Sequence, residues 1–142
     1  MNAIIKQRNF DVPVEVLFKA FSQPEHLKQW WGPDGFTNTF YAFNFGNGGK
    51  WRFTMHGPDG KEYENESEFE TVKANELIVL RHISKPEYKA TFTFSSISSQ
   101  ASLLVWEMVF ETEKAYEALK DIVAEKNEEN LNRLEKELQN IN

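Results

Sequence analysis

The sequence predicts an α+β fold in which a curved antiparallel sheet of about six to seven strands wraps around a long C-terminal helix, with two short helices after the first strand. Three observations lead to this prediction. Apolar and polar residues alternate along much of residues 36–110, which is the period of a strand. Residues 14–21 and residues 113–139 instead carry apolar residues at helical spacing. A chain of 142 residues fits a single domain, residues 1–142.

The N-terminal elements are a strand and a short helix. Residues 3–10 place apolar side chains among polar ones and predict the first strand. Asp11 is a candidate helix cap, and Pro13 suits the first helical turn, where its missing N–H is not needed. The apolar residues that follow recur at i, i+3, i+4 and i+7 and form one helical face: Val14, Leu17, Phe18 and Phe21.

A second short helix is expected directly afterwards. Ser22 and Glu25 have the spacing of a capping box, and the Gly-Pro pair after Trp31 ends the helix. Trp30 and Trp31 are neighbours on this helix, so their side chains diverge by about 100° and cannot both face one core. Either one indole packs on the sheet while the other lines a cavity entrance, or both close the end of the barrel.

The central segment is predicted to be a series of strands separated by turns. A strand over residues 37–45 is followed by a Gly-Asn-Gly-Gly turn, and the next strand ends at a Pro-Asp-Gly turn. Five glutamates then alternate with Tyr63, Asn65, Ser67 and Phe69, which predicts a long strand with one face in water. Three more strands are expected, over residues 77–82, 90–99 and 102–111.

The last element is a helix over residues 113–139. Its apolar stripe is formed by Tyr116, Leu119, Val123, Leu131, Leu134 and Leu138. Around residues 126–130 this stripe becomes polar. We therefore expect the middle of the helix to lie at an opening rather than in tightly packed core.

Composition and charge exclude several classes of function. The chain has 22 acidic and 16 basic residues, a net charge of −6, which does not favour binding to nucleic acid or to anionic membranes. It has no cysteine, which excludes disulfides, thiolate catalysis and cysteine-based metal sites. No stretch approaches the about 20 apolar residues of a membrane span, and the start lacks the apolar run of a signal peptide. We expect a cytoplasmic protein without membrane insertion.

No motif for metal, cofactor or nucleophilic catalysis is visible. His26, His56 and His82 lie far apart and lack the spacing of metal ligands. No phosphate-binding loop, dinucleotide fingerprint or Ser–His–Asp order occurs. We therefore predict no cofactor, no metal and no catalytic residue. His82 is expected on the same strand face as its apolar neighbours, and it is either a buried core histidine or an acid–base group.

Two motifs together carry a family resemblance. The first runs from Pro24-Glu25-His26-Leu27 through Trp30-Trp31-Gly32-Pro33, and the second is Gly48-Gly49 with Trp51-Arg52-Phe53. With the order of elements, they make the chain resemble the START-like (SRPBCC) superfamily, whose architecture is the helix-grip fold. Within it, the chain looks most like the family named after the C-terminal domain of activators of the heat-shock protein 90 ATPase. The resemblance covers essentially the whole chain.

The resemblance implies a cavity between the sheet and the terminal helix. In the superfamily this cavity commonly holds lipids, sterols, polyketides or other planar apolar molecules. The residues expected to point toward it are Trp31, Trp51, Phe53, Met55, Tyr63, Asn65, Ser67, His82, Phe92, Phe94, Trp106, Met108, Tyr116 and Val123. The apolar members could equally pack as solid core, but the polar trio Tyr63, Asn65 and Ser67 suits a wet or ligand-filled cavity, because buried groups without partners cost about 1–3 kcal/mol each.

Three functions are compatible with these residues. The first is binding of a small apolar or aromatic molecule in the cavity. The second is cyclase- or hydrolase-like chemistry there, with His82 or Tyr63 as acid–base groups. The third is a chaperone cofactor, although the eukaryotic activators dock the chaperone through a distinct additional N-terminal domain that has no counterpart among these residues.

Overall fold

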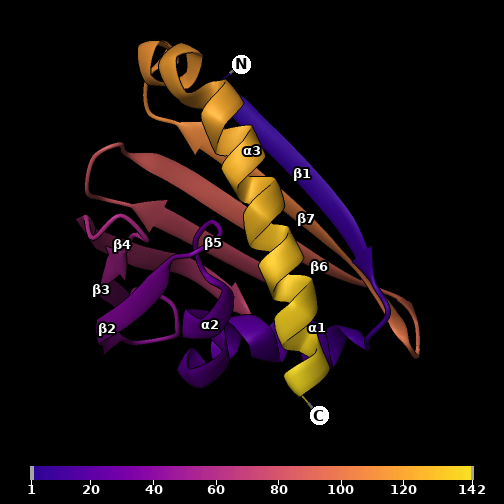
Figure 1. Ribbon diagram of the computed structural model, residues 1–142. Coiled ribbons are helices and arrows are strands. Elements are labelled where there is room, and N and C mark those ends of the chain that lie inside the picture. Colours follow the sequence, from indigo (N-terminus) through magenta and orange to yellow (C-terminus); the bar gives the residue numbers. More distant parts are fainter. Residues whose placement is uncertain (1, 142) are drawn as a thin grey trace.

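The computed structural model describes residues 2–141 as one curved sheet crossed by a long helix (Figure 1). Two short helices lie at the end of the sheet that the C-terminal half of the long helix reaches. A single turn of 3-10 helix (Leu138–Asn140) ends the helical segment. The elements are β1 (Ala3–Phe10), α1 (Val14–Ser22), α2 (Pro24–Trp30), β2 (Thr37–Phe43), β3 (Lys50–His56), β4 (Glu62–Lys73), β5 (Leu77–His82), β6 (Tyr88–Ser98), β7 (Ala101–Phe110) and α3 (Glu113–Glu137).

The sheet has seven antiparallel strands in the order β1-β7-β6-β5-β4-β3-β2. The predicted α+β helix-grip architecture, with six to seven strands and two short helices after the first, is therefore confirmed. Cross-strand pairing sets which side chains share a face, with Met55 opposite Tyr63 and Phe53 opposite Asn65. Because these pairs point to the face that α3 crosses, their neighbours Thr54 and Glu64 point to the other.

The predicted caps of α1 and α2 are wrong. Pro13, not Asp11, precedes α1, and no side chain caps either helix. Ser22 remains the last helical residue of α1, so it cannot adopt the extended backbone that a capping residue needs. Gln23 serves both helices instead: its N–H donates to the Lys19 carbonyl of α1, and its own carbonyl accepts from the backbone of α2. The Ser22–Glu25 capping box does not form.

A core of aromatic side chains fills the space between the sheet and the helices α1 and α2. Phe18 and Phe21 of α1 meet the ring of Phe94 edge-on, with centroids 5.0 Å apart in each pair. Trp30 is buried in this cluster, and its indole N–H donates to the Ala20 carbonyl over 2.9 Å. Each ring buries a large apolar area and satisfies the edge-to-face preference of aromatic pairs. This half of the interior is solid.

The helix α3 changes character along its length. Thr112 caps it by accepting from the Ala115 N–H. Its buried side chains all come from its second half: Asn127, Asn130, Leu131 and Leu134. The first half contributes only half-buried apolar side chains, among them Tyr116, Leu119 and Val123. The second half is thus the part that anchors the helix on the sheet.

Candidate functional site

Two adjoining hollows lie where the sheet, the loop after α2 and the middle of α3 meet. The inner hollow has a volume of about 180 Å³. The outer hollow has a volume of about 540 Å³ and opens more widely to solvent. Five residues line both and make them continuous: Pro33, Met55, Asn65, Pro86 and Tyr88.

The inner hollow is mainly apolar. Trp106, Met108 and Phe110 of β7 form one wall, because every second residue of this strand faces α3. Trp31 contributes its ring from the loop after α2, with its centroid 6.0 Å from that of Trp106. Val123 of α3 covers the opposite side. An apolar hollow of this kind is the usual form of a small-molecule site.

The helix supplies polar groups at the same place. Asn127 and Asn130 line the inner hollow with only 8% and 5% of their surfaces exposed. The Asn127 amide donates to the Met108 sulfur over 3.2 Å, a weak acceptor, and the Asn130 side-chain oxygen accepts from the Gly32 N–H. The polar interruption of the helix stripe therefore does coincide with a hollow, as the sequence predicts.

A second polar group surrounds His82 in the outer hollow. The His82 ring stacks on Tyr88, with centroids 4.5 Å apart and planes 11° apart. Its two nitrogens face oxygen atoms of Pro86 (2.9 Å) and Asn65 (2.7 Å). Burial lowers the pKa of His82, although hydrogen bonds to the backbone of Pro86 and Ser84 act to raise it. A neutral imidazole has one ring proton, so it donates to only one of these oxygens at a time.

Tyr88 lines both hollows, and its hydroxyl has no hydrogen-bond partner among the described residues. Burial raises the pKa of this hydroxyl far above its ordinary value. The phenol therefore stays protonated and remains a donor. Tyr88 is not among the site residues predicted from the sequence. The sequence pattern places the start of the strand at Ala90, whereas β6 begins two residues earlier, at Tyr88.

The predicted site residues divide into two groups. Trp31, Met55, Asn65, Trp106, Met108 and Val123 line the inner hollow, and Tyr63 and His82 line the outer one with Met55 and Asn65. Tyr63 is 46% exposed and contacts the ring of Phe36. The other predicted residues line neither hollow: Trp51, Phe53, Ser67, Phe92, Phe94 and Tyr116.

The second group lies mostly in the aromatic core. Trp51 and Phe53 stack on each other with centroids 4.3 Å apart, and Phe92 stacks on Trp106. The Ser67 hydroxyl and the Trp51 indole N–H are buried without a hydrogen-bond partner. The two hollows thus lie toward the end of the inward sheet face that α1 and α2 leave uncovered.

Arg133 holds the wall that Trp31 and Pro33 form. Its guanidinium donates to backbone carbonyls from Gln29 to Phe36, four of them at 2.8–2.9 Å. Asn130 and Glu129 bind the same loop through the N–H groups of Gly32 and Asp34. The sequence does not predict these Arg133 contacts, because no local pattern around an arginine on a charged helix indicates hydrogen bonds to residues about one hundred positions away.

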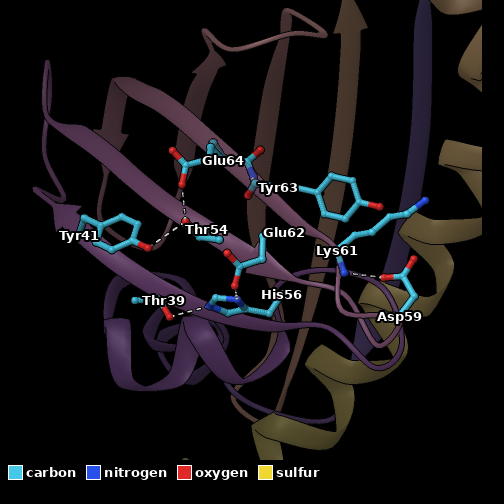
Figure 2. A network of polar contacts seen from close by, with 10 residues as sticks. Thr39, Tyr41, Thr54, His56, Asp59, Lys61, Glu62, Tyr63 and Glu64 are labelled. Atoms are coloured by element: carbon cyan, nitrogen blue, oxygen red, sulfur yellow. Dashed lines mark hydrogen bonds and ion pairs between the residues drawn. The ribbon is translucent and has the colours of Figure 1, made fainter.

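A further polar cluster lies on the opposite face of the sheet (Figure 2). The His56 ring bridges the Thr39 hydroxyl and the Glu62 carboxylate, at 2.8 Å on each side. The Thr54 hydroxyl joins Tyr41 to Glu64 (Figure 2). The hydroxyl–imidazole–carboxylate order is that of a nucleophilic triad, but neither Thr39 nor His56 lines either hollow. These contacts join β2, β3 and β4 on the solvent side of the sheet.

A family model matches residues 11–139 of the chain: "Activator of Hsp90 ATPase homolog 1-like protein". The chain belongs to this family. The predicted resemblance is thereby confirmed, and the family's fold is one that commonly holds hydrophobic ligands. No curated protein sequence matches the chain significantly.

Several solved structures from bacteria superpose closely on this chain. A solution structure from Arthrobacter aurescens is 21% identical with a TM-score of 0.90 and covers 97% of this chain and 86% of its own. One from Staphylococcus epidermidis is 26% identical with a TM-score of 0.85, covering 98% and 90%. A crystal structure of a protein of the same family from Silicibacter pomeroyi is 22% identical with a TM-score of 0.78, covering 96% and 97%. These likenesses establish the fold.

Two further findings concern residues 2–141 as a whole. No helix in this range combines the length and the apolar character needed to cross a membrane. Nor does the range contain a group of at least three histidine, aspartate or glutamate side chains placed to hold a metal ion.

Proposed function

We propose that this protein binds a small, largely apolar molecule in the inner hollow, between the sheet and α3. One observation carries the proposal: the largely buried residues Asn127 and Asn130 line a mainly apolar hollow, and each leaves one hydrogen-bonding atom of its carboxamide unused. These unused atoms face the hollow, where water or a polar atom of a guest can bind them. Two amides with free hydrogen-bonding atoms inside a mainly apolar hollow are the arrangement expected of a site that orients a guest.

The arrangement of polar and apolar groups supports the same proposal. Ligand sites combine apolar walls with a few polar atoms that fix the orientation of the guest. Here the walls are the rings of Trp31 and Trp106 with Met108, and the polar atoms come from α3. The outer hollow provides a route of entry, because it shares lining residues with the inner one and opens to solvent.

A binding screen tests the proposal directly. Because Trp31 and Trp106 line the hollow, a bound guest should change tryptophan fluorescence and shift the indole N–H resonances of these two residues. The panel should contain fatty acids, sterols, and flavonoid-like and naphthalene compounds. If saturating members of every class leave both indole signals unchanged, the proposal is wrong.

A pair of variants on α3 makes the screen specific for the hollow. Val123→Phe adds a ring to a lining residue, whereas Ile122→Phe adds the same ring at the neighbouring position, which is 53% exposed. We expect any ligand found to lose at least about tenfold in affinity with Val123→Phe, because the added ring occupies its space. Ile122→Phe should bind as the native protein does. Equal affinities for the two variants would place the ligand elsewhere.

A further inference from the structure

Two side chains that line the hollows, Tyr88 and Asn130, leave hydrogen-bond donors unused. The Tyr88 hydroxyl has no hydrogen-bond partner among the described residues, so its proton is available to a guest. The Asn130 amide nitrogen makes no hydrogen bond, because only its oxygen is engaged, by Gly32. Asn127 has the reverse arrangement: its nitrogen contacts the Met108 sulfur, and its oxygen is unused. Tyr88 and Asn130 therefore offer protons to a guest, and Asn127 offers an oxygen.

The charged side chains of the lining residues are engaged by other protein groups. Lys126 lines the inner hollow and pairs with Glu129, and Lys85 at the outer hollow pairs with Glu87 at 2.8 Å. The carboxylates of Glu62 and Glu64 also belong to outer-hollow residues, but they are engaged by His56 and Thr54 on the opposite face of the sheet (Figure 2). Each charged lining side chain therefore already has a protein partner.

We propose that the ligand of this site is uncharged and presents a hydrogen-bond acceptor, such as a ketone, ester or amide carbonyl, to the donors of Tyr88 and Asn130. This inference rests on the proposed binding function and specifies the chemistry of the guest. A carbonyl oxygen accepts the protons that these groups leave unused. A carboxylate or an ammonium group would have to lose its hydration without a free counter-charge in the hollow, which is costly.

Three naphthalenes of matched size test the inference: acetonaphthone, ethylnaphthalene and naphthoate. They share one bicyclic ring and differ in carrying a neutral acceptor, no polar group or a negative charge. We expect acetonaphthone to bind about three- to tenfold more tightly than ethylnaphthalene, the gain of one or two neutral hydrogen bonds. Naphthoate should bind at least about tenfold more weakly than acetonaphthone. Affinities are measured by tryptophan fluorescence and checked by chemical shifts.

A pair of tyrosine variants assigns the effect to the hollow. Tyr88→Phe removes a hydroxyl that has no protein partner, so the fold should not be affected. Tyr116→Phe removes the hydroxyl of a half-buried tyrosine on α3 that lines neither hollow. We expect Tyr88→Phe to weaken acetonaphthone about threefold or more while ethylnaphthalene binds unchanged. Tyr116→Phe should leave both affinities unchanged.

The outcomes separate the inference from the function on which it rests. If acetonaphthone binds best and loses its advantage in Tyr88→Phe, the inference is supported; if it keeps that advantage in Tyr88→Phe, the inference is overturned. If naphthoate or ethylnaphthalene binds as tightly as acetonaphthone, the inference is overturned while the binding function stands. If neither the three naphthalenes nor the wider panel binds, the proposed function fails, and the inference fails with it.

Discussion

Replacing Arg133 with methionine should destabilise the protein strongly, because this one side chain fastens α3 to the loop after α2. The guanidinium donates to the carbonyls of Gln29, Gly32, Pro33 and Phe36 at 2.8–2.9 Å, and more weakly to Trp31 at 3.4 Å. Methionine keeps an aliphatic chain of similar length but donates nothing. The variant therefore removes the hydrogen bonds and leaves most of the packing.

The expected loss is about 3–4 kcal/mol in the free energy of unfolding. Hydrogen bonds to a charged group contribute about 1.5–3 kcal/mol each, but those of one side chain are not additive. The more exposed carbonyls of the loop regain water, which limits the loss to about two such bonds. The positive charge near the C-terminal end of α2 adds a smaller favourable interaction with the helix dipole.

Urea denaturation followed by tryptophan fluorescence measures this loss, and Arg8→Met is the matched control. Arg8 also makes two side-chain hydrogen bonds to α3, to Asn132 and Glu128, but they lie in more exposed positions. A surface pair of this kind contributes about 0–1 kcal/mol. If the two variants lose the same free energy, the fastening role of Arg133 is refuted. We also expect Arg133→Met to weaken ligand binding, because the loop forms part of both hollows.

Three other predictions follow from single contacts. Gly32→Ala should cost about 1–2 kcal/mol in urea denaturation, because Gly32 has a φ of +102° and a Cβ there would lie 2.7 Å from the Met55 methyl group; a loss below 0.5 kcal/mol would contradict this. Burial lowers the pKa of His82, so as the pH falls the unfolded chain is protonated at this residue before the folded protein is, and the free energy of unfolding should decrease below about pH 6.5. His82→Gln should make the free energy of unfolding depend less steeply on pH in this range; an unchanged dependence would contradict the prediction. Leu134→Ala should cost about 3 kcal/mol and Leu119→Ala about 1 kcal/mol in the same assay, since Leu134 is fully buried and Leu119 half-buried; equal losses would contradict this.

The fold could be predicted because segments with the two-residue period of a strand and segments with the helical period of about 3.6 residues rarely overlap in this sequence. The alternation of Trp51, Phe53 and Met55 gives the correct inward face, and cross-strand pairing continues it into β4. The helix stripe predicts α3 and also the place where its packing loosens. Local caps were less predictable, because Ser22 has the right spacing for a capping box but is still needed by α1.

The candidate site could be predicted only in part. Sequence parity shows which strand residues face inward, but it does not show how far α1 and α2 extend over that face. Phe92 and Phe94 therefore share a face with residues of the hollow and yet lie against Phe21 in the core. The role of Tyr88 depends on where its strand begins, and the role of Arg133 depends on contacts with residues distant in sequence. Neither feature produces a local sequence pattern.

The position of the hollow follows from two features of α3 and the sheet. Toward its C-terminus, α3 is fixed by Leu131, Leu134 and the Arg133 contacts, over a sheet face that α1 and α2 also cover. Toward its N-terminus, its apolar side chains are half-buried or, like Ile122, exposed. Between the two, Asn127 and Asn130 meet the apolar end of β7, and polar amides cannot pack there as leucines would. A guest that satisfies these amides would therefore add contacts to the less tightly packed half of α3, so ligand binding should order that half more than the anchored one.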